Sequence, residues 1–374
     1  MGTQPVEVLI DDQIFLMHAR GGISRYFAEL IREFRAHPEW GIRALTSVRR
    51  SPNQHLRDVD PRVRDLGFPE QSFSWKVAKR FAAYPSAFAA RGLRPDVVHY
   101  TYYDPRKLAL FRGVPKVVTI HDMVPELLPA DLVDGNPHMA KRAYVEHADA
   151  IICVSEATRD DLFAVWGEIT DIPVIVTGHA TSERFHRDVR PAWLGFEYLL
   201  YVGSRDHYKN FRTLLTAYAA SWAPTAGVRL VAVGGGDFTA AERAEMEALE
   251  VTELVVQSTV AEADLPGYYR GAAAFIFPSL SEGFGIPVLE AMSVGTPTVL
   301  SDLKVFREVA GDAAMFFPAG DAPALTACID RLLGDPPLRE QLRTSGLARA
   351  AQYSWEATAH TTAELYRQLV AEHS

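Results

Sequence analysis

The sequence predicts an α/β protein made of two doubly wound domains. Its 374 residues are more than one hydrophobic core usually organises. Short apolar runs alternate with amphipathic stretches in both halves, which is typical of parallel sheets flanked by helices. We expect one domain over residues 1–185, a second over 186–352, and a C-terminal helix over 353–374 that crosses back to the first. The boundary is placed in the polar segment 179–196.

Buried strands are predicted where an apolar run is bounded by turn residues. They are residues 6–10, 96–100, 116–121 and 150–155 in the first half, and 198–203, 229–234, 254–258, 272–279 and 297–301 in the second. The first clear helix follows Gly21 and Gly22, because apolar residues recur on one helical face from Ile23 to Phe34. The last stretch, 353–374, is predicted to be a helix capped near Ser354.

Composition excludes several classes of protein. No run approaches the roughly 18 apolar residues of a membrane span, and the N-terminus does not look like a secretory signal. The formal net charge of −9 argues against nucleic acid as a partner. Cys153 and Cys328 each lie in an apolar run and are expected to be buried free thiols, which fits a cytoplasmic protein.

One basic region stands out. Residues 43–116 hold 15 Lys and Arg against 6 Asp and Glu, a local charge of +9. Within this region, residues 72–94 place apolar side chains on one helical face, with Lys76, Lys79 and Arg80 elsewhere. This segment either rests on anionic lipid headgroups or packs on the first domain as an ordinary surface helix.

Two carboxylates flank a predicted helix start in "SLSEGFGIPVLEAMSVGTP", residues 279–297. Pro287 suits the first turn of that helix, and Gly295 ends it. Glu290 would lie one turn inside the helix, where it can accept two ribose hydroxyls, and Glu282 would precede the turn on the side of a sugar. The alternative is two solvated surface glutamates.

The amides at this helix start form a predicted anion site. The N–H groups of Phe284, Gly285 and Ile286 would point out of the helix at the carboxyl end of a strand. Ligands of open α/β sheets bind at that end, and the helix dipole favours a phosphate there.

A cationic pair follows another predicted strand in "YVGSRDHYKNFRTLLTAY", residues 201–218. The strand ends at Gly203, and Arg205 and Lys209 come next. Two cations at the carboxyl end of a strand are suited to binding a diphosphate and to stabilising charge on a leaving nucleotide. The alternative is a pair of exposed loop cations.

The first half offers two weaker candidates. His121 and Asp122 follow a buried strand, and the histidine can donate to a substrate oxygen or carry a proton near neutral pH. Gly21 and Gly22 precede a helix and can let a ligand approach the backbone. The alternatives are a structural histidine and a plain turn.

Taken together, these stretches resemble the retaining glycosyltransferases of family 4, which have the GT-B fold. The similarity is carried by "GGISRY", "TIHDMVPELLP", "YVGSRDHYKN" and "FPSLSEGFGIPVLEAMSVGTPTV", in the order of the family, over residues 8 to 360. The last contains the E-x7-E motif, which is specific, whereas the glycine pair and His-Asp are weak alone. The particular residues within these motifs look like those of bacterial mannosyltransferases that build surface polysaccharides.

The resemblance implies two Rossmann-like domains facing across a cleft, the first binding the acceptor and the second the nucleotide sugar. It implies that Glu290 holds the ribose, Glu282 contacts the donor sugar, and Arg205 and Lys209 neutralise the diphosphate. The amides of Phe284, Gly285 and Ile286 would meet sugar or phosphate oxygens. His121 would face the donor sugar, Gly21 and Gly22 the phosphate and acceptor, and Ser258 to Val260 the base. Many relatives have Lys-Gly where this chain has Lys209-Asn210.

The resemblance also implies the reaction. A hexose, with GDP-mannose as the first guess for its donor, would pass with retention to a saccharide or lipid-linked acceptor, without a metal or other cofactor. The products would be polysaccharide or lipopolysaccharide, made in the cytoplasm or on the cytoplasmic face of the membrane. A nucleotide-sugar epimerase or a phosphorylase on the same architecture, or a silent binding subunit, remains as an alternative.

Overall fold

The computed structural model describes residues 4–67, 92–108, 110–129, 137–205 and 207–373. The chain divides into two compact units. The first comprises Met1–Pro125, Leu132–His179 and Trp355–Ser374, and the second Glu126–Asp131 and Ala180–Ser354. The domain limits predicted from the sequence stay a prediction, and most of the basic 72–94 segment lies outside the described residues.

The first unit is built on a parallel sheet with the strand order β2-β1-β3-β4-β5-β6. Its strands are β1 (Val6–Ile10), β2 (Ile42–Thr46), β3 (Val97–Tyr100), β4 (Lys116–Ile120), β5 (Ala150–Cys153) and β6 (Val174–Val176). Its helices include α1 (Gln13–Met17), α2 (Gly22–Ala36), α3 (Gln54–Val59), α6 (Lys141–Glu146), α7 (Glu156–Trp166) and α15 (Trp355–His373). Short helical turns are η1 (Pro38–Trp40), η2 (Pro105–Lys107) and η4 (Pro137–Ala140), and α5 (Val124–Leu127) spans the boundary between the units after Pro125.

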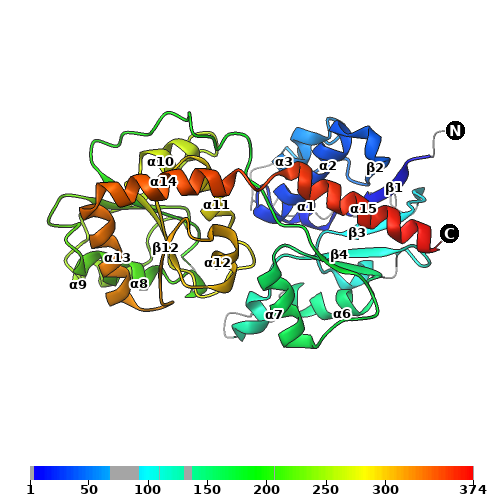
Figure 1. The fold of residues 1–374 in the computed structure, drawn as a ribbon. Helices are drawn as coiled ribbons and strands as arrows, with labels where there is room; N and C mark the ends of the chain where they lie inside the picture. The colour runs from blue at the N-terminus through cyan, green and yellow to red at the C-terminus, as the bar shows by residue number, and fades with distance from the viewer. Residues whose placement is uncertain (1–3, 68–91, 109, 130–136, 206, 374) are drawn as a thin grey trace. The chain divides into compact units, whose positions relative to one another are not determined.

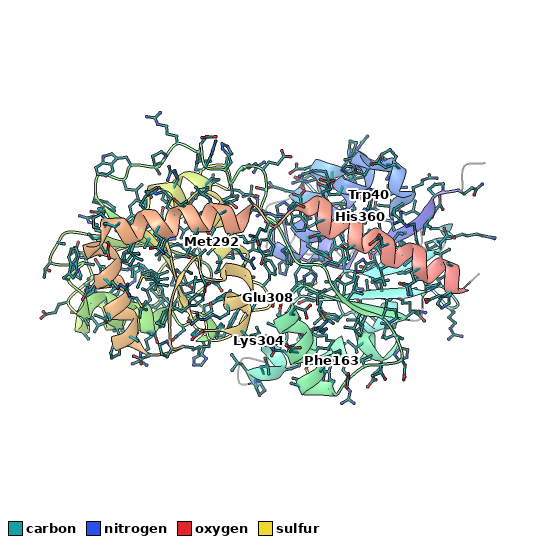
Figure 2. The ribbon with its side chains drawn as sticks, in the orientation of Figure 1. Trp40, Phe163, Met292, Lys304, Glu308 and His360 are labelled. Carbon is teal, nitrogen blue, oxygen red and sulfur yellow. The ribbon has the colours of Figure 1, made fainter. Side chains whose placement is uncertain are left out.

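The C-terminal helix α15 is part of the first unit. It packs along α2 and against strands β1 and β3 (Figure 1). Trp40 lies beside His360 of α15, with ring centroids 5.3 Å apart (Figure 2). Deeper in, the hydroxyl of Tyr366 lies 2.5 Å from Nδ1 of His99, a buried residue of β3. The last helix therefore completes the core of this unit.

The second unit repeats the architecture, with the strand order β12-β11-β10-β7-β8-β9. Its strands are β7 (Tyr198–Val202), β8 (Arg229–Val233), β9 (Val255–Ser258), β10 (Ala274–Phe277), β11 (Thr298–Ser301) and β12 (Met315–Phe317). Its helices are η5 (His207–Lys209), α8 (Phe211–Ala220), α9 (Ala240–Ala248), α10 (Leu265–Gly271), α11 (Ile286–Ser293), α12 (Lys304–Ala310), α13 (Ala322–Gly334) and α14 (Pro336–Ala350).

Helix α14 braces the helices beside the sheet of the second unit. Met292 of α11 lies against Gly346 of α14 (Figure 2), where a side chain on the glycine would meet Met292 Cγ at 3.4 Å. Arg349 of α14 donates to the carbonyl of Val309 at 2.9 Å and to that of Glu308 at 2.5 Å. These bonds satisfy the last carbonyl groups of α12, which otherwise lack partners within their helix.

The α/β fold class predicted from the sequence is confirmed, since both described sheets are parallel and flanked by helices. The predicted strands are all present within a residue or two. Within the described residues, no helix combines the length and the hydropathy that crossing a membrane requires. Both cysteines are free thiols, as expected, but only Cys153 is buried and Cys328 is partly exposed.

Candidate active site

The start of α11 is held in one conformation by a glycine. Gly285 precedes the helix with φ of +91°, in the left-handed region that favours glycine. A Cβ at this position would lie 2.7 Å from Cε1 of Phe306. The amide of Val288 makes the first turn bond, to the carbonyl of Gly285 at 2.9 Å. The N–H groups of Gly285 and Ile286 precede that bond, as at the start of any α-helix.

Glu290 lies on α11 and is held by a tyrosine. Its side chain is only 5% exposed, and the hydroxyl of Tyr269 donates to its Oε2 at 3.0 Å. Tyr269 belongs to α10 and is fully buried. A buried carboxylate is stable only where it accepts hydrogen bonds, so Tyr269 contributes to keeping Glu290 in place.

Glu282 and Lys209 form an ion pair. Nζ of Lys209 lies 2.6 Å from Oε1 of Glu282, and both side chains are nearly buried. The hydroxyl of Ser279 donates to the same carboxylate oxygen at 2.7 Å. The first acid of the E-x7-E motif and one of the two predicted cations therefore lie together.

The segment that carries Lys209 is attached to the loop after β10. The amide of Leu280 donates to the carbonyl of Tyr208 at 2.7 Å, and Nδ2 of Asn210 donates to the carbonyl of Pro278 at 3.1 Å. Asn210 adopts φ of +55°, the conformation that glycine takes most easily and asparagine tolerates. Asn210 therefore adopts a backbone conformation that glycine also can, and its side chain adds a hydrogen bond that glycine could not make.

Arg205 has many partners of its own. Its Nε donates to Glu242 at 2.5 Å, and its other nitrogens donate to the carbonyls of Gly234, Gly235, Gly236 and Asp237 at 2.7 to 3.4 Å. Its guanidinium also lies 4.7 Å from the ring centroid of Phe238. Burial acts to raise the pKa of Glu242, but the hydrogen bond from Arg205 lowers it. In this structure Arg205 therefore orders the glycine-rich loop after β8.

The remaining predicted residues of the second unit follow neighbouring strands. Gly203 follows β7, and its amide donates to the carbonyl of Val233 at the end of β8 at 2.9 Å. Ser258 ends β9, and its hydroxyl lies 3.5 Å from that of Tyr268 in α10. Val260 is two residues further along. Because β10, β7, β8 and β9 are neighbours and parallel, all these residues share the carboxyl edge of one sheet.

His121 follows β4 in the first unit. Its ring centroid lies 5.2 Å from that of Tyr26 and 5.8 Å from that of Phe27, both on α2. That helix begins at Gly22, after an extended Gly21, whose carbonyl accepts a hydrogen bond from Ser24 at 3.0 Å. His121 therefore packs against the helix that begins at the glycine pair.

His121 is kept neutral by its surroundings. Burial lowers its pKa well below the ordinary value, and the nearby His179, His99, Lys141 and His138 add to the effect. The fully buried Lys141 donates from Nζ to the carbonyl of Asp122 at 2.8 Å and so fixes the backbone after His121. A neutral imidazole can donate one hydrogen bond and accept another, which suits contact with a sugar.

Two family descriptions match this chain, one for each half. Glycosyltransferase Family 4 matches residues 20–183, and Glycosyl transferases group 1 matches residues 183–349. The chain belongs to the family 4 glycosyltransferases. The O-antigen chain mannosyltransferase B of Escherichia coli is 28% identical over 383 aligned positions, which cover 93% of this chain and 96% of that protein.

Solved glycosyltransferases share the fold. The sucrose-phosphate synthase of Thermosynechococcus elongatus matches with a TM-score of 0.74 and 22% identity, over 99% of this chain and all of that one. A protein of Anabaena solved with UDP and glucose matches with a TM-score of 0.69 and 15% identity, over 96% of this chain and 98% of that one. This glycosyltransferase has the GT-B fold. The roles assigned to its site residues, and the cleft between its domains, stay predictions.

The sequence did not identify the residues that hold the two glutamates. Tyr269 and Ser279 each donate to one of them. Tyr269 stands in "PGYYRGA", directly before β10, and an aromatic pair in a short helix carries no distinctive spacing. Ser279 stands three residues before Glu282, where its hydroxyl could have been recognised as a local hydrogen-bond donor.

Proposed function

We propose that this glycosyltransferase moves a hexose from a nucleotide sugar to a saccharide or lipid-linked saccharide, with retention of configuration, in the synthesis of a surface polysaccharide or lipopolysaccharide. A GDP-linked donor such as GDP-mannose is the first candidate. The E. coli relative named as an O-antigen chain mannosyltransferase supports both the sugar and the product. That relative lends no support to an epimerase.

The observation that carries the proposal is the arrangement around the start of α11. Glu282 stands before this helix start, bonded to Lys209 at 2.6 Å, and Glu290 stands one turn inside it, bonded to Tyr269 at 3.0 Å. In the proposal Glu290 accepts the ribose hydroxyls, Glu282 binds the donor sugar, and the amides of Gly285 and Ile286 bind phosphate oxygens. The positive charge beside the leaving diphosphate comes from Lys209.

Arg205 can bind the diphosphate only if it gives up one of its present contacts. The sequence assigns it to the diphosphate, yet its donors hold the loop Gly234–Asp237 and Glu242. A guanidinium has five N–H donors, so binding a phosphate oxygen requires Arg205 to exchange one of these carbonyl bonds. We propose that it does so when the nucleotide is bound, and that it otherwise orders the loop beside the diphosphate.

The proposed reaction breaks the bond between the anomeric carbon and the diphosphate oxygen and forms a bond from that carbon to the acceptor oxygen. The acceptor hydroxyl attacks on the face from which the diphosphate leaves, and the diphosphate takes the hydroxyl proton. Lys209 stabilises the negative charge that grows on the leaving group. In the first domain, His121 contacts the donor sugar, and Gly21 and Gly22 contact the phosphate and the acceptor.

Membrane contact belongs to the proposal as well. The local charge of +9 over residues 43–116 would attract anionic lipids, which suits a lipid-linked acceptor at the cytoplasmic face. The test is co-sedimentation with vesicles of phosphatidylcholine alone or mixed with phosphatidylglycerol. Binding that needs the anionic lipid and is lost at high salt supports the contact, and absence of binding to both vesicles contradicts it.

A thermal-shift panel tests the donor class. GDP, UDP, dTDP and ADP are added separately, because a ligand that binds the native state raises the melting temperature. A rise of several degrees with GDP and less with the others supports a GDP-linked donor. A larger rise with UDP would change the proposed donor to a UDP-linked sugar. An unchanged melting temperature with every nucleotide would contradict the proposed function.

Product analysis tests the reaction itself. With GDP-mannose and a mannose-terminated acceptor, NMR of the product is expected to show an α linkage, the configuration of the donor. A β linkage would contradict retention, and an altered sugar still joined to its nucleotide would indicate an epimerase. Transfer is expected to continue in excess EDTA, and its loss, with recovery on adding Mg²⁺ or Mn²⁺, would contradict metal independence.

A further inference from the structure

Tyr269 of α10 contacts α11 at its middle and the chain just after its end. Its hydroxyl donates to Oε2 of Glu290 at 3.0 Å, and its backbone carbonyl accepts from Oγ1 of Thr296, just after α11, at 2.7 Å. Its ring packs against Phe275 of β10, with centroids 5.2 Å apart, and against Phe185 at 5.9 Å. The tyrosine is therefore fixed on several sides before it reaches the glutamate.

To bind a ribose, the carboxylate of Glu290 has to be held in one orientation. A glutamate side chain has three rotatable bonds, and binding two ribose hydroxyls requires one orientation of its carboxylate plane. The fully buried Tyr269 cannot itself reach a ligand, since none of its side chain is exposed. We therefore expect its hydroxyl to affect ligand binding through Glu290, the carboxylate to which it donates.

We infer that Tyr269 is a positioning residue that orients Glu290 toward the ribose of the bound nucleotide. The inference rests on the proposed function, because it assumes that Glu290 binds a ribose. It adds a residue that lies outside the E-x7-E motif, on a different helix, and it assigns the hydroxyl of that residue a measurable effect on ribose recognition.

The neighbouring residue of α10 extends the same arrangement. The hydroxyl of Tyr268 lies 3.5 Å from that of Ser258, at the end of β9 where the base is predicted to bind. The hydroxyl of Tyr198 donates to the carbonyl of Tyr268 at 2.8 Å and fixes this part of α10 to β7. Consecutive tyrosines of one short helix thus contact the predicted ribose residue and the predicted base residue.

The test compares two ligands that differ only at the ribose. GDP and 2′,3′-dideoxy-GDP are titrated calorimetrically into the wild-type protein and into Tyr269→Phe, which removes only the hydroxyl. We expect Tyr269→Phe to bind GDP about five- to tenfold more weakly, a range that corresponds to the net contribution of one ordinary intramolecular hydrogen bond. We expect its affinity for dideoxy-GDP to stay within about twofold of the wild type.

Two control variants separate positioning from a general loss of stability. Thr296→Val removes the other hydrogen bond between Tyr269 and the end of α11 and leaves Glu290 untouched. Tyr218→Phe removes a buried tyrosine hydroxyl that donates to the carbonyl of Val228, on α8. Both are expected to retain the wild-type preference for GDP over dideoxy-GDP.

The outcomes distinguish the inference from the proposed function. If the wild type prefers GDP to dideoxy-GDP and Tyr269→Phe binds GDP as tightly, the inference is wrong and the proposed function stands. Equal weakening for both ligands in Tyr269→Phe also overturns the inference. If the wild type binds neither GDP nor UDP, both fail.

A structure of the wild type with GDP provides a test that does not depend on a variant folding. The inference requires a ribose hydroxyl within hydrogen-bond distance of the Glu290 carboxylate, with the Tyr269 hydroxyl still bonded to that carboxylate. A ribose bound elsewhere, or a Tyr269 hydroxyl turned to another partner, would overturn it.

Discussion

Nζ of Lys209 lies 2.6 Å from Oε1 of Glu282. The two side chains are 13% and 12% exposed, so solvent screens this pair far less than a surface pair. The hydroxyl of Ser279 donates to the same carboxylate oxygen, and the Lys209 ammonium lies 5.1 Å from the ring centroid of Phe277. The ammonium is thereby fixed in position before any ligand binds, with its charge balanced by Glu282. A fixed position is the preorganisation that stabilising a growing negative charge requires.

Replacing Lys209 by methionine is expected to lower kcat by about a hundredfold or more, because a charge opposite the leaving diphosphate is lost. Glu282→Gln is expected to lower kcat as well, and the double variant to lose less than the product of the two, since the residues interact directly. The measurement is steady-state kinetics with the preferred nucleotide sugar, alongside thermal melting of each variant.

Arg212→Met serves as the matched control for that experiment. Arg212 pairs with Glu245 at 2.8 Å in the same unit, but its side chain is 84% exposed. Surface pairs of this kind contribute about 0–1 kcal/mol, so kcat and stability should stay close to wild type. A folded Lys209→Met enzyme with the kcat of Arg212→Met would refute the assigned role of the lysine.

Arg205→Lys is expected to destabilise the protein by about 2–4 kcal/mol, because a lysine cannot reproduce several bonds to the Gly234–Asp237 carbonyls and Glu242. Urea unfolding measures the loss, with Arg212→Lys as the control. Stability equal to that of the control would mean that the contacts of Arg205 do not order this loop.

Gly285→Ala is expected to cost about 1–3 kcal/mol and to displace the start of α11. The residue has φ of +91°, and the new methyl group would lie 2.7 Å from Phe306 Cε1. Gly227→Ala is the control, since Gly227 has φ of +78° and a methyl group there would have nothing within 4 Å. If the two variants lost the same free energy of unfolding, the contact with Phe306 would contribute nothing to the cost of Gly285→Ala.

Acid is expected to weaken the first unit through its buried histidines. Burial lowers the pKa of His99 and of His179 to about 3 and lowers that of His121 well below its usual value. Below about pH 6.5 these histidines are protonated in the unfolded chain but remain neutral in the folded chain. The free energy of unfolding therefore falls as the pH drops toward 3. Each histidine contributes a slope of at most about 1.4 kcal/mol per pH unit.

Urea unfolding between pH 7.5 and 5 measures this dependence. His99→Gln is expected to reduce the slope by up to about 1.4 kcal/mol per pH unit, the contribution of one proton. A wild-type stability that does not change between pH 6.5 and 5 would contradict the neutral, buried state of these rings.

Much of the fold was predictable because its central strands are nearly continuous apolar runs. The predicted strand 116–121 corresponds to β4 (Lys116–Ile120), and 229–234 to β8 (Arg229–Val233). The strands that were missed, β2, β6 and β12, lie at sheet edges. In β2 the charged Arg43 interrupts the apolar pattern, as an edge strand allows because one of its sides has no neighbour. The strands β6 and β12 are apolar but only 3 residues long, too short to stand out as strands in the sequence.

The candidate site was predictable in its positions but less so in its contacts. Gly203, Lys209 and Glu282 could be selected because glycines and charged residues that follow the carboxyl ends of predicted strands are typical of ligand sites. The direction of the Arg205 side chain could not be predicted, because its partners, backbone carbonyls and the Glu242 carboxylate, lie 29 to 37 residues away. Nor could the bond from Tyr269 to Glu290, because it depends on how two short helices pack.

The central claim is that the residues around the start of α11 transfer a sugar from a nucleotide donor. The most direct measurement is acceptor-dependent release of GDP from GDP-mannose, run in parallel with UDP-glucose, by the wild type and by Glu282→Gln. We predict steady release from one donor that requires acceptor and falls at least a hundredfold in the variant. Release at equal rates by both proteins, or none from either donor with a mannose-terminated acceptor, would contradict the claim.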